Sequence, residues 1–241
     1  MIDIAIEALR WYEWGGVGTG SEASAAAVQR GTGRPLAAGV AALERAAALL
    51  DAGGVVAHPT STVYGLGGRP ARGVDERISA LKRRPPGPLI RLAASREALH
   101  EALPGVRWSG AARRLADAFW PGPLTLVLDD GSEAGIAVRV DPHPIVRRLL
   151  ERAGGLMTST SLNETGRLPA RTRREARDAL ASMRPQVGPV GWLDAGDLEA
   201  TPPSTLVRMR GETVEVLREG PVSALEIEQF LRGSGRRGAP G

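Results

Sequence analysis

Residues 55–67 read VVAHPTSTVYGLG, an apolar run that passes directly into a turn rich in hydroxyl groups and glycine. Valine favours extended structure, and proline and glycine end such a run. Residues 120–125 (WPGPLT) and 158–166 (TSTSLNETG) have a similar construction. In open α/β sheets, loops of this kind converge at strand ends, where ligands bind. The three segments together predict an α/β fold with a ligand site where these loops meet.

Apolar periodicity along the rest of the chain predicts alternating helices and strands, as expected for the α/β class. Asp75, Ser95 and Ser109 are expected N-caps, His143 is expected to begin a helix, and Pro59 to Gly68 is expected to be turn-rich. The expected helices cover residues 36–53, 75–82, 95–103, 109–119, 143–153 and 173–183 and a segment from 223, and the expected strands cover 55–57, 89–92, 124–128, 136–140, 155–160, 190–193, 205–209 and 214–217.

The 241 residues are enough for one globular domain, and 42% of them are hydrophobic. Residues 1–36 contain two glycine-rich stretches, 15–21 and 31–33, which cannot bury much apolar surface. We therefore expect a flexible N-terminal extension over 1–36, one globular domain over 37–232 and a frayed tail over 233–241.

Composition narrows the functional classes. The chain has no cysteine and only three histidines, so disulfides and a structural zinc site are not expected. The N-terminus lacks the pattern of a secretory signal, and no apolar run is long enough to span a bilayer, which predicts a cytoplasmic protein without a membrane role. The formal charge of +4 permits a polyanionic ligand or nucleic acid without requiring one.

Lys82 is the only lysine and Asn163 the only asparagine of the chain. A lysine among arginines marks a place where a compact, rotatable ammonium group is wanted instead of a planar guanidinium group. Lysine commonly binds phosphate as a point charge. Lys82 and Arg84 lie where a helix is expected to end before Pro85, and both are candidate phosphate ligands.

The polar segments, taken in order, resemble the YrdC-like family of L-threonylcarbamoyladenylate synthases. That family's pattern contains a Pro-Thr-x-Thr-x-Tyr-Gly-Leu loop, Lys-x-Arg-Pro, Pro-Gly-Pro-Leu-Thr, an Arg-Val pair, and a Ser-x-Asn loop followed by Ser or Thr and Gly. The matching residues here are 59–66, 82–85, 121–125, 139–140 and 161–166. The likeness covers residues 38 to 230 or so, a whole domain.

The resemblance implies a curved, twisted mixed sheet with flanking helices around a basic concave cavity. It implies the formation of threonylcarbamoyl-AMP and pyrophosphate from L-threonine, bicarbonate and ATP. Mg²⁺ would accompany the ATP phosphates, with no metal site formed by the protein itself. The expected partners are a downstream threonylcarbamoyl transferase and, through it or directly, tRNA or double-stranded RNA.

The resemblance also assigns roles to individual residues. Lys82 and Arg84 are expected to act on the triphosphate as catalytic cations. The further nucleotide ligands are expected to be Thr125, Ser161, Asn163, Arg218 and Arg171. Thr62 and Ser159 are expected to hold L-threonine. Tyr64 and Trp120 are interpreted as core or wall aromatics, and His58 as a structural histidine.

Two other functions stay open at this level. A basic surface could bind double-stranded RNA or tRNA without catalysis, in which case binding would be steeply salt-dependent and indifferent to Lys82 or Asn163. A carbamoyl-handling adenylating paralogue is the third possibility. The chain departs from the family pattern at the shortened stretch 86–88, at Leu162 in place of alanine and at Asp129, and these changes could alter the substrate or weaken activity.

Overall fold

A computed structural model describes residues 8–14, 37–71, 73–85, 87–183, 188 and 190–234. These residues form one sheet of eleven strands in the order β11-β10-β6-β7-β5-β8-β4-β3-β9-β1-β2. The strands are β1 (Arg10–Trp14), β2 (Ala37–Ala38), β3 (Val55–His58), β4 (Gly65–Gly68), β5 (Ile90–Ala93), β6 (Leu124–Leu128), β7 (Ile136–Val140), β8 (Leu156–Ser161), β9 (Val190–Asp194), β10 (Thr205–Arg210) and β11 (Thr213–Arg218).

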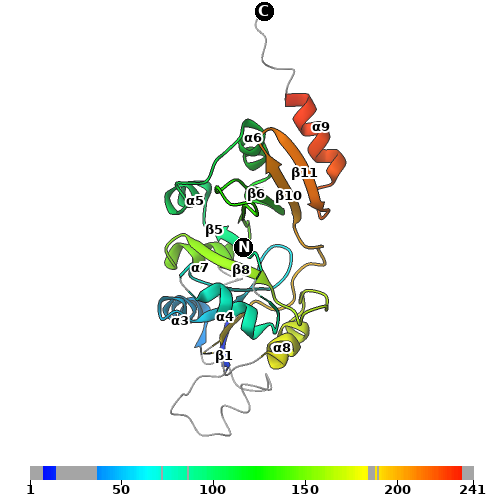
Figure 1. The fold of residues 1–241 in the computed structure, drawn as a ribbon. Helices are drawn as coiled ribbons and strands as arrows, with labels where there is room; N and C mark the ends of the chain where they lie inside the picture. Colours follow the sequence, from blue (N-terminus) through cyan, green and yellow to red (C-terminus); the bar gives the residue numbers. More distant parts are fainter. Residues whose placement is uncertain are drawn as a thin grey trace, which may run out of the picture.

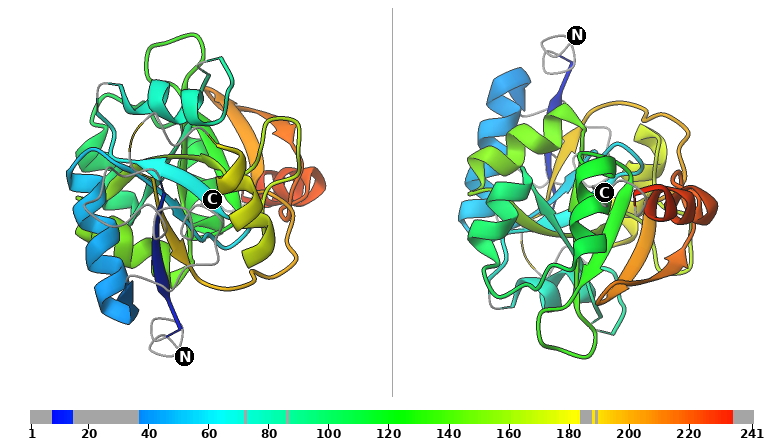
Figure 2. Two further views of the ribbon diagram at one scale, coloured as in Figure 1. Left: turned by 90° about the horizontal axis from the view of Figure 1, so that it is seen from below. Right: turned by 90° about the horizontal axis from the view of Figure 1, so that it is seen from above.

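Helices flank this sheet. They are α3 (Gly39–Asp51), α4 (Val74–Leu81), α5 (Arg96–Ala102), α6 (Gly110–Phe119), α7 (Pro144–Arg152), α8 (Arg173–Ser182) and α9 (Ala224–Ser234). Figure 1 shows α9 beside β10 and β11 at one end of the molecule and α3 towards the other. The two views of Figure 2 also place α3 and α9 on opposite sides.

The sheet is mixed. Strand pairs β5/β7, β3/β9 and β10/β6 are parallel, whereas β3/β4, β4/β8, β5/β8, β6/β7, β10/β11 and β1/β9 are antiparallel. The α/β class with a mixed sheet and flanking helices is therefore confirmed. Strands that are far apart in the sequence lie side by side in this sheet, because β8 pairs with β4 and β10 pairs with β6.

Alternation along β6, β7 and β10 separates a core from a cavity. Leu126, Val138 and Val207 point to a hydrophobic cluster formed with α5, α6 and α9. Their neighbours Val127 and Arg139 line a cavity on the opposite face. Because successive strand residues point to opposite faces, this two-residue period gives the sheet a helix-covered side and a ligand-accessible side.

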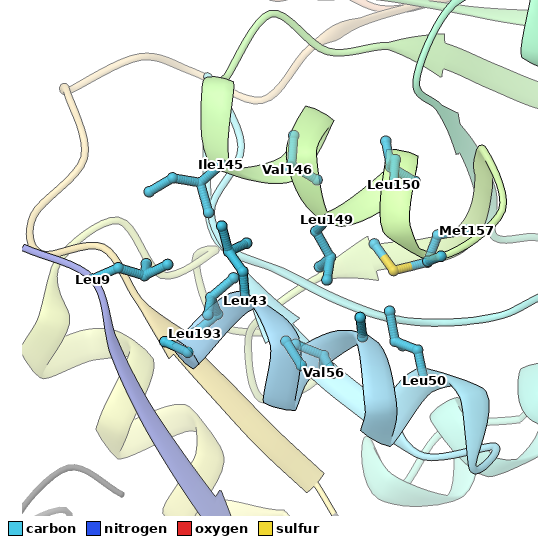
Figure 3. Close-up of a cluster of buried hydrophobic side chains, with 14 of the residues drawn as sticks. Leu9, Leu43, Leu50, Val56, Ile145, Val146, Leu149, Leu150, Met157 and Leu193 are labelled. Atoms are coloured by element: carbon cyan, nitrogen blue, oxygen red, sulfur yellow. The ribbon is translucent and has the colours of Figure 1, made fainter. Parts of the chain in front are cut away.

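A second cluster lies between α3, α7 and the sheet (Figure 3). Leu43 and Leu50 of α3 meet Leu149 and Leu150 of α7, and all four side chains are fully buried. Apolar residues recur at helical spacing on both helices, so each helix presents one apolar stripe to its neighbour. The third cluster packs α4 and α8 against β3, β4 and β9.

The N-terminal prediction is wrong for the described part of residues 1–36. Arg10–Trp14 forms β1, which pairs with β9 and β2, and Trp11 is fully buried. Aromatic residues favour strands, and the free edge of β9 supplies the backbone partner that a local reading of the sequence does not reveal. Residues 1–7 and 15–36 lie outside the described residues, as does the tail from residue 235, and residues 233–234 of the expected tail belong to α9.

Two local predictions also need correction. Gly65–Gly68, expected within a turn, forms β4 because β3 and β8 pair with it on both sides. Asp75 does not cap α4, whose N-cap is Gly73 with φ of 86°. The Asp75 carboxylate instead accepts hydrogen bonds from Arg91 and from the Thr158 hydroxyl.

Other helix starts are as predicted. The side chains of Ser95, Ser109 and His143 each accept a hydrogen bond from a backbone N–H in the first turn of their helix. Such caps satisfy donors that would otherwise have no partner, which is why they can be recognised locally. Within the described ranges, none of the helices has the length and apolar character needed to cross a membrane.

Candidate functional site

A cavity of about 290 Å³ lies on the face of the sheet opposite α6 and α9. Its walls come from β4, β5, β6, β7, β8, β10 and β11 and from the loops after β3 and before β10. The polar residues that line it are Thr60, Thr62, Arg139, Ser159, Thr160, Ser161, Ser204, Arg208 and Arg218. The three polar segments of the sequence contribute unequally. Thr60, Thr62, Val63 and Gly65 line the cavity, as do residues 159–161, whereas Thr125 does not.

A buried ion pair anchors the loop after β3. Arg139 and Asp141 are 3% and 0% exposed, and the Nη2 to Oδ2 distance between them is 2.6 Å. The Asp141 carboxylate also accepts hydrogen bonds from the backbone N–H groups of Ser61 (3.0 Å) and His143 (2.9 Å). Burial lowers the pKa of Arg139 and the Asp141 charge opposes this, so the guanidinium group keeps its proton. The pair fixes the hydroxyl-bearing loop to β7.

The hydroxyl groups of that loop have defined directions. Thr60 Oγ1 donates to the carbonyl of Val63 at 2.6 Å and lies 3.2 Å from Thr62 Oγ1. Thr60 Oγ1 also accepts from the backbone N–H groups of Thr62 and Val63, each at 3.2 Å, so its proton and both of its lone pairs are in use. Thr62 Oγ1 also accepts a hydrogen bond from Arg139 Nη1 at 3.1 Å. Thr62 therefore lines the cavity with one lone pair taken by Arg139.

Lys82 and Asn163, 81 positions apart in the sequence, are in direct contact. The Lys82 ammonium donates to Asn163 Oδ1 at 2.9 Å and to the Ser161 carbonyl at 2.7 Å. Burial and then the neighbouring Arg84 lower the pKa of Lys82 to about 8. The Ser161 hydroxyl also donates to Asn163 Oδ1, at 2.7 Å. The structure thus joins three of the predicted nucleotide ligands, of which Ser161 lines the cavity, whereas Lys82 and Asn163 contact it from outside the lining.

Arg84 adds a second cation beside Lys82. Its Nε and Nη2 atoms are buried and have no hydrogen-bond partner among the described residues. Arg83 separates the two, is exposed, and adopts a left-handed backbone with φ of 54° after the end of α4. Buried guanidinium donors without a partner are costly unless an anion satisfies them, and this arrangement favours an anionic ligand.

Arg218 lines the far side of the cavity. It donates through Nε and Nη2 to the Ser204 carbonyl, at 3.2 and 2.9 Å. The Ser204 hydroxyl lies 2.8 Å from that of Thr125, which is 1% exposed. Arg208 lines the same part of the wall. Thr125 therefore supports this wall from behind.

Three further predictions can be placed. The backbone of Arg171 holds the start of α8, since its N–H donates to Glu175, and Arg171 is not one of the described residues that line the cavity. Leu162 is fully buried in the cluster of α4 and α8, so its extra bulk enters the core. Asp129 pairs with Arg107 at an exposed turn. Pro86 lies outside the described residues.

The aromatic residues have structural positions, as interpreted. Tyr64 is fully buried, donates its hydroxyl proton to the Gly196 carbonyl and accepts from the N–H of Ala195. Trp120 donates through Nε1 to the Leu124 carbonyl at 2.6 Å. His58 is fully buried, and both of its ring nitrogens have partners.

Sequence reasoning did not select Arg139, Asp141, Ser204 or Arg208 as site residues. A signal existed for the first two, because an arginine in the alternating strand 136–140 with an aspartate two positions later suggests a paired buried charge. For Ser204 and Arg208 the sequence offered only a hydroxyl residue and one of many arginines. Among the described residues, no three His, Cys, Asp or Glu side chains are grouped as a metal site would require.

Comparisons with known proteins show the family and the fold of the chain. The model of the Sua5/YciO/YrdC family, described as "Telomere recombination", matches residues 48–220. The threonylcarbamoyl-AMP synthase of Alkalilimnicola ehrlichii is 40% identical over 154 residues, which are 58% of this chain and 77% of that protein. P. abyssi Sua5 complexed with L-threonine superposes with a TM-score of 0.69 at 30% identity, covering 80% of this chain and 58% of that one. E. coli YciO has a TM-score of 0.66 at 25% identity, covering 79% and 94%.

Proposed function

Because the chain belongs to the Sua5/YciO/YrdC family, we propose that it is a threonylcarbamoyl-AMP synthase. The substrates of that reaction are ATP and L-threonine, and the bound amino acid in the related Sua5 structure supports the second of them. The observation that carries the proposal is the cavity, which is lined by hydroxyl groups and arginines and has the Lys82–Asn163 contact next to its lining residue Ser161.

The chemistry needs a cavity of this kind more than it needs a protein nucleophile. The threonine amine takes up carbon dioxide, supplied as bicarbonate, and forms a carbamate. A carbamate oxygen then attacks the α-phosphorus of ATP, and the bond from that phosphorus to the bridging oxygen breaks, so that pyrophosphate leaves with the electron pair. Positioning of the two substrates and neutralisation of the developing charge supply the catalysis in such phosphoryl chemistry.

The residue roles extend this proposal. Lys82 and Arg84 would bind the triphosphate, because the Lys82 side chain is buried, and Arg84 Nε and Nη2 are buried without partners among the described residues. Arg218 would bind phosphate from the opposite wall. Ser161 and Asn163 would position Lys82, and Thr62 and Ser159 would contact the threonine. Thr125 and Arg171 would act through Ser204 and through the start of α8, in support of the wall.

Further components follow from the same proposal. Mg²⁺ would enter with ATP and be held by the phosphate oxygens, and its charge would assist those of the cations. A threonylcarbamoyl transferase would consume the product and modify tRNA, which would place the protein in the cytoplasm.

The test is pyrophosphate release from ATP by the purified protein, with and without L-threonine and bicarbonate. We expect release that requires both co-substrates and that falls at least a hundredfold in Lys82→Ala. Arg83→Ala is the matched control, because Arg83 is adjacent, cationic and exposed. If well-folded protein releases no pyrophosphate above background, the proposal is wrong. Salt-dependent RNA binding that is unchanged in Lys82→Ala would then favour the RNA-binding alternative.

A further inference from the structure

The imidazole of His58 is buried beside the cavity in a defined protonation state. Its Nδ1 lies 3.2 Å from the Pro59 carbonyl oxygen, and its Nε2 lies 3.0 Å from Ser159 Oγ. A carbonyl oxygen can only accept, so Nδ1 carries the ring proton and Nε2 is left as an acceptor. Burial lowers the pKa of His58 to about 4 and keeps the ring neutral. The bond to Ser159 is therefore donated by the serine.

The strand next to His58 leaves space for the ring. A Cβ atom on Gly65 would lie 2.6 Å from Cε1 of His58, 2.8 Å from its Nε2 and 2.9 Å from Ser159 Oγ. A Cβ atom on Gly67 would lie 3.2 Å from the same Nε2. Gly67 and Ser159 are also direct partners in the pairing of β4 with β8. The glycines of β4 therefore allow the imidazole to reach across that strand to the serine, which fixes the contact.

This contact decides what Ser159 can offer a ligand. A hydroxyl group has one proton, and that of Ser159 is given to His58, so Oγ has only lone pairs left for the cavity. We propose that His58 is a positioning residue that makes Ser159 an obligate acceptor for a hydroxyl or ammonium donor of the amino-acid substrate. This inference rests on the proposed function and deepens it, because it states which chemical groups of the substrate the wall selects.

Thr62 lines the same cavity, and its Oγ1 accepts a hydrogen bond from Arg139 Nη1 at 3.1 Å. Ser159, an acceptor whose proton is used on His58, disfavours phosphate oxygens, which are themselves acceptors, and favours a donor-bearing group. Ser159 thus suits the amino or hydroxyl group of the amino acid, whereas Arg208 and Arg218 suit phosphate.

A double-mutant cycle tests the role of His58. His58→Phe keeps a planar ring but removes the acceptor, which releases the Ser159 proton. We expect the KM for L-threonine to rise roughly tenfold in His58→Phe and in Ser159→Ala, with the KM for ATP unchanged. The double variant should be no worse than Ser159→Ala, because both changes remove one interaction. His58→Gln should recover part of the loss, since its amide oxygen can accept. If the increases in the KM for L-threonine of the two single variants multiply in the double variant, the inference is wrong. An unchanged KM for L-threonine in His58→Phe would also overturn it.

A second measurement does not depend on turnover. Nitrogen NMR of the imidazole rings is tractable because the chain has only three histidines. We expect His58 to carry its proton on Nδ1 at neutral pH, with the resonance assigned by its loss in His58→Phe. A proton on Nε2 would overturn the inference even if the protein is an active synthase. If the protein releases no pyrophosphate, calorimetric binding of L-threonine to wild type and His58→Phe replaces the kinetic comparison, and equal affinities or no binding would reject the assignment.

Discussion

Replacing Asp141 by alanine should destabilise the protein strongly, because this carboxylate has four partners and no solvent contact. It faces Arg139 at 2.6 Å and accepts hydrogen bonds from the N–H and hydroxyl groups of Ser61 and from the N–H of His143. Arg139, at 3% exposure, would keep its charge without a counter-ion. Breaking a buried pair by removing one partner typically costs about 3–5 kcal/mol.

The measurement is the free energy of unfolding from urea titration, together with the thermal midpoint. For a chain of this size a cost in that range lowers the midpoint by about 6–20 °C. Asp141→Asn should cost less, since its amide oxygen still accepts while the charge is lost. Asp130→Ala is the matched control, because Asp130 is exposed and bonds only to Ser132 within its own turn.

The loss should also appear in ligand binding. The loop with Ser61 and Thr62 is fixed to β7 through Arg139 and Asp141, so a weakened pair frees a cavity wall. We expect Asp141→Asn to raise the KM for L-threonine while the fold persists. If Asp141→Ala lowers the free energy of unfolding by less than about 1 kcal/mol, the pair is not the anchor described above.

Two further changes test other contacts. The pKa of Lys82 is lowered to about 8 in the folded protein, so ATP affinity should begin to fall as pH rises past about 8. Calorimetry of a Lys82→Met variant should show weak ATP binding whose affinity does not fall over this pH range. The unfolded chain holds more protons than the folded one between pH 8 and the ordinary lysine value of about 10.4, so the Lys82 contribution to stability should increase with pH over that window. Glu212→Ala should lower the free energy of unfolding by about 1 kcal/mol, because the carboxylate accepts from the N–H groups of Gly110 and Ala111 at the start of α6. Glu215→Ala is its control, because Glu215 is an exposed residue of β11. Equal urea midpoints for the two variants would contradict the capping role of Glu212.

Much of the fold was predictable because it depends on neighbours in the sequence. Helix starts at Ser95 and Ser109 could be recognised from a side chain and an N–H group three positions later. The alternating strands 124–128 and 136–140 could be recognised because a two-residue period is a local property. The lone Lys82 and Asn163 pointed to a site because their chemistry differs from that of the rest of the chain.

The chain alone therefore determined which residue types are present, where most helices and strands begin, and which segments carry polar chemistry. Only the tertiary structure decided that Gly65–Gly68 is a strand and that Arg10–Trp14 extends the sheet, because a strand depends on backbone partners far away in sequence. It also decided the pairing of His58 with Ser159, 101 positions apart, and of Arg139 with the loop at Ser61. The direction of a hydrogen bond and the burial of a side chain depend on residues that the fold brings together, so no local sequence pattern predicts them.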